Sequence, residues 1–259
     1  MDMIEEELAR NRTTLERLKA EGAVIGQSWG GLGDNLSFST LPERLSSEGI
    51  ECFLSTQNVC RNLEINDLVW TRNPFIKGVV DRPPNAGGPM GDIFDKGISV
   101  SLGFIERIEL SHGLAPVNSA PKIYYRPQRR GDYAGKILID LGSVSFGAPV
   151  ATLVEYVKFV VMRYRYAPAD LVQVRFKSGV ASKNTFALEG VPKVTVESLY
   201  EYCDLLGSVG GFITVHSGAQ SLAVALREHN PSIKIHAFAL PLQFNWRSYI
   251  YKDVEYYVR

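Results

Sequence analysis

Short unbroken apolar runs alternate with stretches in which apolar residues recur every three or four positions. The unbroken runs predict strands over Ala23–Gln27, Ile50–Ser55, Ile137–Leu141, Leu171–Phe176, Val191–Val196, Gly211–Val215 and Ile233–Leu240. The recurring positions predict helices over residues 1–20, from Leu36 to Leu45, and over Ile98–Leu110, Val150–Tyr164, Glu197–Leu206 and Ser217–His229. Strands that alternate with helices predict an α/β fold built on parallel sheets.

A polar segment, Tyr124–Asp132, separates two halves of the chain. Each half opens with a strand, a glycine turn and a helix, although no residue-level repeat relates them. We therefore predict two Rossmann-like lobes facing a cleft, one over residues 1–130 and the other over 131–259. The arginines of the separating segment are either part of a solvated linker or a source of positive charge at the cleft. They are Arg126, Arg129 and Arg130.

Three further segments have a distinct character. The first helix is either exposed or an arm that packs on a partner subunit. Residues 80–97 are rich in Gly, Pro and Asp and predict a loop long enough to have a function. The aromatic tail Phe244–Arg259 is expected to cross back and pack on the first lobe; sugar stacking or a subunit interface are the alternatives.

Composition narrows the class of protein. The 259 residues include 28 basic and 28 acidic side chains, and this balance argues against a general nucleic-acid binder. Three cysteines without C-x-x-C spacing form no metal set and suit a reducing compartment. The start of the chain has no signal-peptide pattern, and no apolar run approaches the length of a membrane span. These features predict a soluble, cytoplasmic protein.

The turn Gly30–Asp34 is the first candidate site. Its glycines follow a strand and open a helix, so they either relieve crowding or direct N–H groups at an anion. It is neither a dinucleotide fingerprint nor a Walker loop. Asp34 either caps the helix or accepts a proton from an attacking hydroxyl as a general base.

A second candidate is the segment Thr214–Leu226, in which a strand ends at His216 and a helix follows at once. Its small residues either pack against the sheet or form an anion site from the Ser217 hydroxyl and the N–H groups of Gly218 and Ala219. His216 lies where α/β proteins place ligand contacts, although a hydrogen-bonded structural histidine is the alternative.

Together the two motifs resemble the bacterial lipopolysaccharide heptosyltransferase family and its autotransporter-modifying relatives. These are inverting enzymes of the two-lobed GT-B fold. In that family a Gly-Gly-Leu-Gly-Asp turn carries the catalytic aspartate, and Asp34 matches it. A C-terminal Asp-Ser/Thr-Gly-x-x-His-x-Ala segment contacts the donor diphosphate. Ser217, Gly218 and Ala223 match that segment, whereas His216 and Ser221 replace its aspartate and histidine.

The resemblance implies transfer of a sugar from a nucleotide-diphosphate donor to a hydroxyl acceptor, with inversion. The absence of Asp-x-Asp removes the metal-binding motif of GT-A transferases, so we expect no metal and no cofactor beyond the nucleotide sugar. The acceptor is a glycan, a lipid-linked molecule or a protein, and a homo-oligomer is left open. The expected site comprises Asp34 as base, Gly31, Gly33 and Asn35 on the acceptor side, and Ser143, Lys177, His216, Ser217, Gly218 and Ala219 on the donor side.

Two other functions stay open. A sugar-nucleotide epimerase or hydrolase of the same fold would need further carboxylates or histidines in the cleft, and the four histidines show no such grouping. A non-catalytic nucleotide-binding or assembly module is favoured by the short first lobe and by the altered donor motif.

Overall fold

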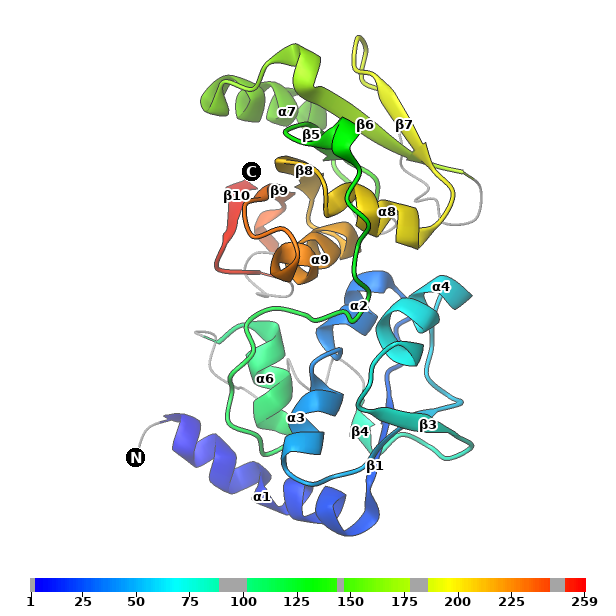
Figure 1. The fold of residues 1–259 in the computed structure, drawn as a ribbon. Helices are drawn as coiled ribbons and strands as arrows, with labels where there is room; N and C mark the ends of the chain where they lie inside the picture. The colour runs from blue at the N-terminus through cyan, green and yellow to red at the C-terminus, as the bar shows by residue number, and fades with distance from the viewer. Residues whose placement is uncertain (1–2, 89–101, 144–146, 178–185, 243–249) are drawn as a thin grey trace. The chain divides into compact units, whose positions relative to one another are not determined.

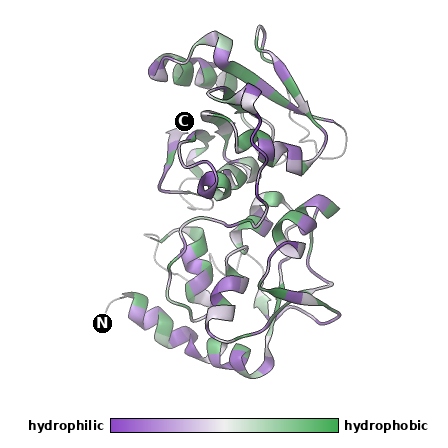
Figure 2. Ribbon diagram, in the orientation of Figure 1, coloured by the Kyte–Doolittle hydropathy of each residue, from purple (hydrophilic) through white to green (hydrophobic). Residues whose placement is uncertain are grey.

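The computed structural model describes residues 3–88, 102–143, 147–177, 186–242 and 250–259. The chain forms two compact α/β units. The main division falls between Tyr125 and Arg126, and Ile250 also groups with the first unit. Each unit contains its own parallel sheet (Figure 1). In Figure 2, helices such as α1 and α7 carry both hydrophilic and hydrophobic residues, as expected when only one face of a helix packs on a core.

The first unit contains a four-stranded parallel sheet in the order β3-β2-β1-β4. Its strands are β1 (Ala23–Gly26), β2 (Cys52–Ser55), β3 (Ile76–Val80) and β4 (Ala86–Gly87). Its helices are α1 (Met3–Glu21), α2 (Leu32–Ser37), α3 (Leu41–Ser47), α4 (Leu63–Asn66), a π-helical turn η1 (Asp67–Thr71) and α6 (Phe104–Ser111).

The first helix, α1, packs on this unit along one side. Acidic residues at its start and Lys19 at its end complement the helix dipole. It packs against α6, and Leu18 is completely buried. One side of α1 therefore packs within the unit, and most of its other side chains are exposed.

Three details of the first unit differ from the sequence prediction. The helix expected from Leu36 to Leu45 is two helices, because the chain turns after Phe38 and Pro42 starts the first turn of α3. Strand β3 was not predicted. Neither was β4, which lies inside the segment expected to be a loop. The rest of that segment, from residue 89 onward, and the first residues of the helix predicted over Ile98–Leu110 lie outside the described residues.

The second unit contains a six-stranded parallel sheet in the order β10-β9-β8-β5-β6-β7. Its strands are β5 (Ile137–Asp140), β6 (Leu171–Phe176), β7 (Lys193–Val196), β8 (Gly211–Val215), β9 (Lys234–Ala239) and β10 (Val254–Val258). Its helices are α7 (Val150–Tyr164), α8 (Leu199–Leu206) and α9 (Gly218–Ala225), with short 3₁₀ turns η2 (Gly131–Tyr133), η3 (Pro168–Asp170) and η4 (Leu226–Glu228).

The central strands β5 and β8 are buried along their whole length, as expected for parallel strands covered by helices on both faces. On one face, Ile139, Ile213 and Phe238 pack against Tyr156 of α7. Numbered from β5 outward, the strands follow the Rossmann order, in which three strands wind to one side and three to the other. The prediction of a Rossmann-like α/β fold is confirmed for this unit.

The end of the aromatic tail forms part of the second unit. Val254–Val258 forms β10, which pairs in parallel with β9 at the edge of the second sheet. Tyr251 donates a hydrogen bond to Ser221 of α9 (2.9 Å), and the ring of Tyr257 packs on Tyr156 of α7. Tyr251–Arg259 therefore belongs to the second unit, whereas Ile250 groups with the first. That the tail crosses back to the first lobe stays a prediction. Residues 243–249 lie outside the described part.

A buried histidine joins the strands at this edge of the sheet. His236 of β9 is 2% exposed. Its Nε2 lies 2.8 Å from the Tyr166 hydroxyl, and its Nδ1 lies 3.3 Å from the Glu255 carboxylate of β10. Its ring packs against Tyr164. Burial lowers the pKa of His236 to about 4, and Lys234 adds to this effect.

This low pKa predicts a loss of stability in mild acid. The unfolded histidine has a pKa of about 6.5, so it binds a proton before the folded one does as the pH falls. The contribution of His236 is complete above pH 6.5 and is lost towards pH 4. We expect the free energy of unfolding to fall by ~2 kcal/mol between pH 6.5 and pH 4 because this contribution is lost.

Urea unfolding of the wild type and of His236→Gln at pH 7 and pH 4.5 measures this contribution. The carboxyl groups common to both proteins cancel in the comparison. The wild type should lose more stability than the variant, and equal losses would contradict a neutral, buried His236.

Candidate functional site

The Gly30–Asp34 turn lies at the point where the first sheet changes direction. β1 is followed by β2 and β3 on one side, whereas β4 returns to the other side of β1. Gly26 at the end of β1 pairs with Gly87 at the end of β4. In open α/β sheets, ligands bind beyond the carboxyl ends of the strands at such a switch point. The turn after β1 therefore lies where this fold places a site.

Asp34 caps α2, one of the two roles that its sequence position suggested. Gly31 occupies the N-cap, and its N–H donates a hydrogen bond to Asp34 Oδ2 (2.9 Å). A Cβ on Gly31 would lie 2.5 Å from the same oxygen, so a side chain at this position would make the Asp34 carboxylate shift. Asp34 itself is partly exposed. The cap fixes one carboxylate oxygen and leaves the residue accessible at the surface.

Two of the residues predicted to contact the acceptor are buried. Asn35 is completely buried, and its Nδ2 donates to the carbonyl oxygens of Gly31 (2.9 Å) and Val59 (3.3 Å). Gly33 is buried in the first turn of α2, where its carbonyl accepts a hydrogen bond from Ser37. In this conformation Asn35 has no exposed surface for contact with a bound molecule, and Gly33 has little. Gly31 and Asp34 have exposed surface.

A neighbouring segment missed by the sequence analysis holds this turn. The N–H of Arg61 donates to the carbonyl of Gly30 (2.8 Å), and the N–H of Val59 donates to the carbonyl of Gln27 (3.0 Å). The Gln27 side chain returns a bond to the carbonyl of Val59 (2.7 Å). The segment is short, polar and without periodicity, so the sequence carried no signal for this contact.

The second sheet has its own switch point, between β5 and β8. These strands are adjacent and parallel, with Asp140 opposite Thr214. Their carboxyl ends therefore bring Ser143, which follows β5, to the same edge of the sheet as His216 and Ser217, which follow β8. Ser143 and His216 are 7% and 6% exposed, so only a small part of each reaches the surface.

The start of α9 has the features of an anion site. Ser217 is its N-cap residue, but the hydroxyl makes no capping bond. This buried oxygen has no hydrogen-bond partner among the described residues. Gly218 and Ala219 form the first turn and are partly exposed. First-turn N–H groups lack partners within a helix, so an acceptor here would satisfy both them and the hydroxyl.

Asp140, the last residue of β5, forms hydrogen bonds that hold the backbone at the same edge of the sheet. Its carboxylate accepts hydrogen bonds from the N–H of Gly142 (2.9 Å) and the hydroxyl of Tyr202 (2.7 Å). Burial raises the pKa of Asp140, while these two hydrogen bonds act in the opposite direction. Asp140 thus fixes the turn that carries Ser143, a role that its place in a buried strand did not reveal.

Lys177, predicted to face the donor, is held in a surface ion pair. Its Nζ lies 2.7 Å from the Glu197 carboxylate, and this contact raises the pKa of Lys177. The lysine is exposed at the end of β6. It would have to leave Glu197 to bind a phosphate, and exposed ion pairs of this kind are weak.

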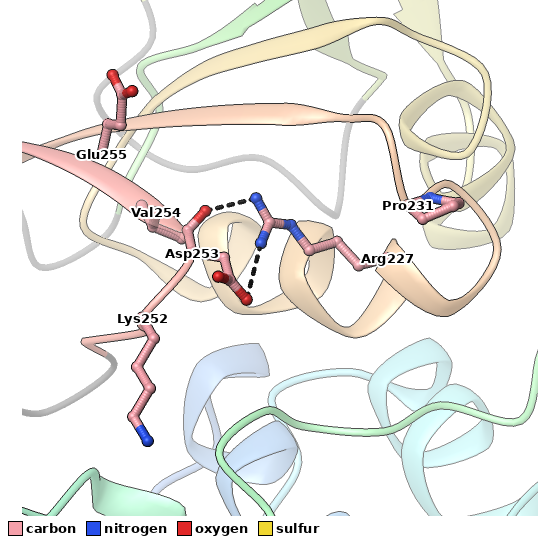
Figure 3. A pocket seen from close by; sticks show the side chains of 6 residues that line it. All are labelled: Arg227, Pro231, Lys252, Asp253, Val254 and Glu255. Carbon is pink, nitrogen blue, oxygen red and sulfur yellow. Dashed lines mark hydrogen bonds and ion pairs between the residues drawn. The ribbon is translucent and has the colours of Figure 1, made fainter.

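An open hollow of about 610 Å³ lies elsewhere on the second unit, at the start of β10 (Figure 3). The Arg227 guanidinium crosses it to the carboxylate and the backbone carbonyl of Asp253. The arginine thereby fastens the turn before β10 to the end of α9. This hollow contains none of the residues predicted for the site.

Two general properties bear on the class of site. Within the described ranges, no group of three or more His, Cys, Asp or Glu side chains is placed to hold a metal ion. No helix in the same residues is both long and apolar enough to cross a membrane.

Neither protein-family models nor the curated proteins give a match to this sequence. The comparison with solved structures does give matches. The iron-containing dodecameric glycosyltransferase TibC from enterotoxigenic E. coli H10407 superposes with a TM-score of 0.54 at 18% identity over 84% of this chain. TibC in complex with ADP-D-β-D-heptose gives a TM-score of 0.54 at 20% identity over 83%. The chain spans 57% of the length of either TibC structure.

A third match is the family 9 glycosyl transferase from Veillonella parvula DSM 2008, with a TM-score of 0.52 at 12% identity. The superposition covers 92% of this chain and 86% of the Veillonella protein. At these identities the likeness concerns the fold. The described residues contain no ligand set that fits the iron named for TibC. With two parallel α/β sheets consistent with the two-lobed GT-B architecture, the chain is similar in fold to the family 9 glycosyltransferases.

Proposed function

We propose that this chain transfers a sugar from a nucleotide-diphosphate donor to a hydroxyl acceptor, with inversion and without a metal ion. The observation that carries the proposal is the position of Asp34. The fold is similar to that of glycosyltransferases, and Asp34 is a partly exposed carboxylate at the switch point of the first sheet. We further propose that the two units form the acceptor and donor lobes and act in the cytoplasm.

In the proposed reaction, the Asp34 carboxylate accepts the proton of the acceptor hydroxyl. The acceptor oxygen forms a bond to the anomeric carbon as the bond from that carbon to the diphosphate oxygen breaks. The electron pair leaves with the nucleoside diphosphate, and attack from the opposite face inverts the anomeric centre. The hydrogen bond from Gly31 holds the carboxylate in place throughout.

The donor side would use the start of α9. The Ser217 hydroxyl has no hydrogen-bond partner in the described part of the chain, and together with the N–H groups of Gly218 and Ala219 it suits two phosphate groups. The positive end of the helix would stabilise the charge of the leaving group. Ser143 at the end of the neighbouring strand and His216 complete the proposed site. Lys177 would contact the donor only after it leaves its ion pair with Glu197.

A non-catalytic nucleotide-binding module is the second candidate. Ser221 stands where the resembling family has a histidine in its donor motif. It is completely buried and bonded to Tyr251 (2.9 Å), so it offers no group to a donor phosphate. This candidate predicts nucleotide binding without sugar transfer.

Two serines offer a matched test of the donor site, because both are N-cap residues of the second unit. The Ser198 hydroxyl accepts a bond from the N–H of Glu201, whereas the Ser217 hydroxyl makes no capping bond. Ser217→Ala should weaken nucleoside-diphosphate binding about fivefold with an unchanged Tm, the loss of one hydrogen bond. Ser198→Ala should lower stability by ~1 kcal/mol and leave binding unchanged.

The measurements are isothermal titration and thermal shift across a panel of nucleoside diphosphates and nucleotide sugars, with sugar transfer to hydroxyl acceptors assayed in parallel. Binding without transfer would favour the non-catalytic module. If no nucleotide stabilises the wild type, or if Ser217→Ala binds as tightly as wild type, the proposed donor site is wrong.

A further inference from the structure

A π-helical turn lies close to the Asp34 turn in the first unit. The short helix α4 continues into η1, which carries Trp70. The indole of Trp70 is completely buried, and its N–H donates a hydrogen bond to Asn35 Oδ1 (2.6 Å). Single π-turns are rare and frequently occur at functional sites. This turn brings a buried donor to the residue next to Asp34.

Trp70 determines which way the Asn35 amide faces. An indole N–H is only a donor, so the oxygen of the amide must point to Trp70. The Asn35 Nδ2 group therefore points the other way, where it donates to the carbonyls of Gly31 (2.9 Å) and Val59 (3.3 Å). The amide therefore connects the π-turn to Gly31, in the turn that carries the proposed base, and to Val59 in the neighbouring segment.

Gly31 is the point where these bonds reach Asp34. Its carbonyl accepts from the side chain and the backbone N–H of Asn35, and its own N–H donates to Asp34 Oδ2. Both polar groups of one residue are thus fixed, one by the chain from Trp70 and one by the carboxylate. These groups lie in adjacent peptide planes that meet at the Gly31 Cα, so a movement of the Gly31–Leu32 peptide would also change the direction of the N–H that Asp34 accepts.

We propose that the Trp70–Asn35 pair is a positioning device that holds the Asp34 carboxylate in the orientation needed for proton transfer. This inference rests on the proposed function. Neither residue touches substrate, because both are completely buried. A purely structural pair would affect the stability of the unit but not the orientation of Asp34.

Trp70→Phe tests this distinction, because it keeps an aromatic ring and removes only the indole and its N–H. Asn35 Oδ1 then retains the thiol of Cys60 (3.2 Å), a weak donor. We expect kcat to fall about tenfold while the KM for the donor stays unchanged. Leu68→Val is the matched control, because Leu68 is buried in the same π-turn and its side chain cannot form a hydrogen bond. It should lower Tm and leave kcat unchanged.

Hydrogen exchange of the Gly31 amide, followed by NMR, gives a readout that does not depend on activity. We expect Trp70→Phe to accelerate this exchange about tenfold relative to the β1 amides, and Leu68→Val to leave the ratio unchanged. If the wild type transfers no sugar, the proposed function fails, and the exchange ratio alone decides whether Trp70 orients the Gly31–Asp34 contact.

If the wild type is active and Trp70→Phe keeps its full kcat and its exchange ratio, the positioning role is wrong and the proposed function stands. If Trp70→Phe and Leu68→Val change kcat and exchange equally, the pair is merely structural and the inference is also overturned.

Discussion

Asp34→Asn is expected to lower kcat by a factor of about 10²–10⁴, the usual contribution of a general base. The amide cannot accept the proton of the acceptor hydroxyl at neutral pH. Its oxygen can still accept the Gly31 N–H that Asp34 accepts in the wild type, so α2 keeps its cap. The expected result is a large loss of turnover with a Tm close to that of the wild type. Initial rates with saturating donor, together with a thermal melt, measure both.

Asp34→Ala separates the cap from the base, since it removes both. It should show the same loss of turnover with a further loss of ~1 kcal/mol in stability. Asp81→Asn provides a control in the same unit, because this carboxylate is exposed and bonded to Thr56. Full activity in Asp34→Asn would show that the carboxylate is a cap only, and the general-base proposal would then fail.

Gly87→Ala is expected to destabilise the first unit by ~4 kcal/mol, because two costs combine. Gly87 has a φ of 93°, a conformation that is strained for any residue with a side chain. A Cβ there would also overlap the backbone carbonyl of Gly26 in β1, and backbone cannot move aside as a flexible side chain can. The overlap should separate β4 from β1.

Gly88→Ala is the matched control. Its φ is 97°, but a Cβ at this position meets nothing within 4 Å. It should therefore cost only the conformational strain, ~1 kcal/mol. Chemical unfolding of the two variants measures the difference. Equal losses would mean that the close approach of β4 to β1 contributes nothing, and would contradict the described pairing at the switch point.

Periodicity predicted most of the second unit because its strands are continuous apolar runs. Ile137–Asp140 and Gly211–Val215 are buried on both faces, and such strands are distinctive in sequence. The signal fails where strands are short or exposed. β4 has two residues, and β3 alternates between partly and fully exposed positions, so neither resembles a buried strand. β10 was concealed because its tyrosines equally suit a packing arm or an interface.

The candidate site was predictable only in part. Glycine turns after strands revealed Asp34 and Ser217, because those positions follow from local chain order. Sequence did not distinguish the cap from the base at Asp34, and it placed the buried Asn35 at the surface. Trp70 and Asp140 act through contacts with residues distant in the chain, and one sequence without periodicity at those contacts gives no indication of them.

The winding of the two sheets has a consequence for the order of folding. In each unit the strand before the candidate turn comes first in the chain. Two further strands lie on one side of it, and only the next strand in the chain pairs with its other side, across the switch point. β1 must wait for β4, and β5 must wait for β8. Closing such long loops is slow, because chain entropy is lost before the contacts form. We therefore expect each half-sheet to form early and each candidate pocket edge to be among the last parts of its unit to acquire native structure.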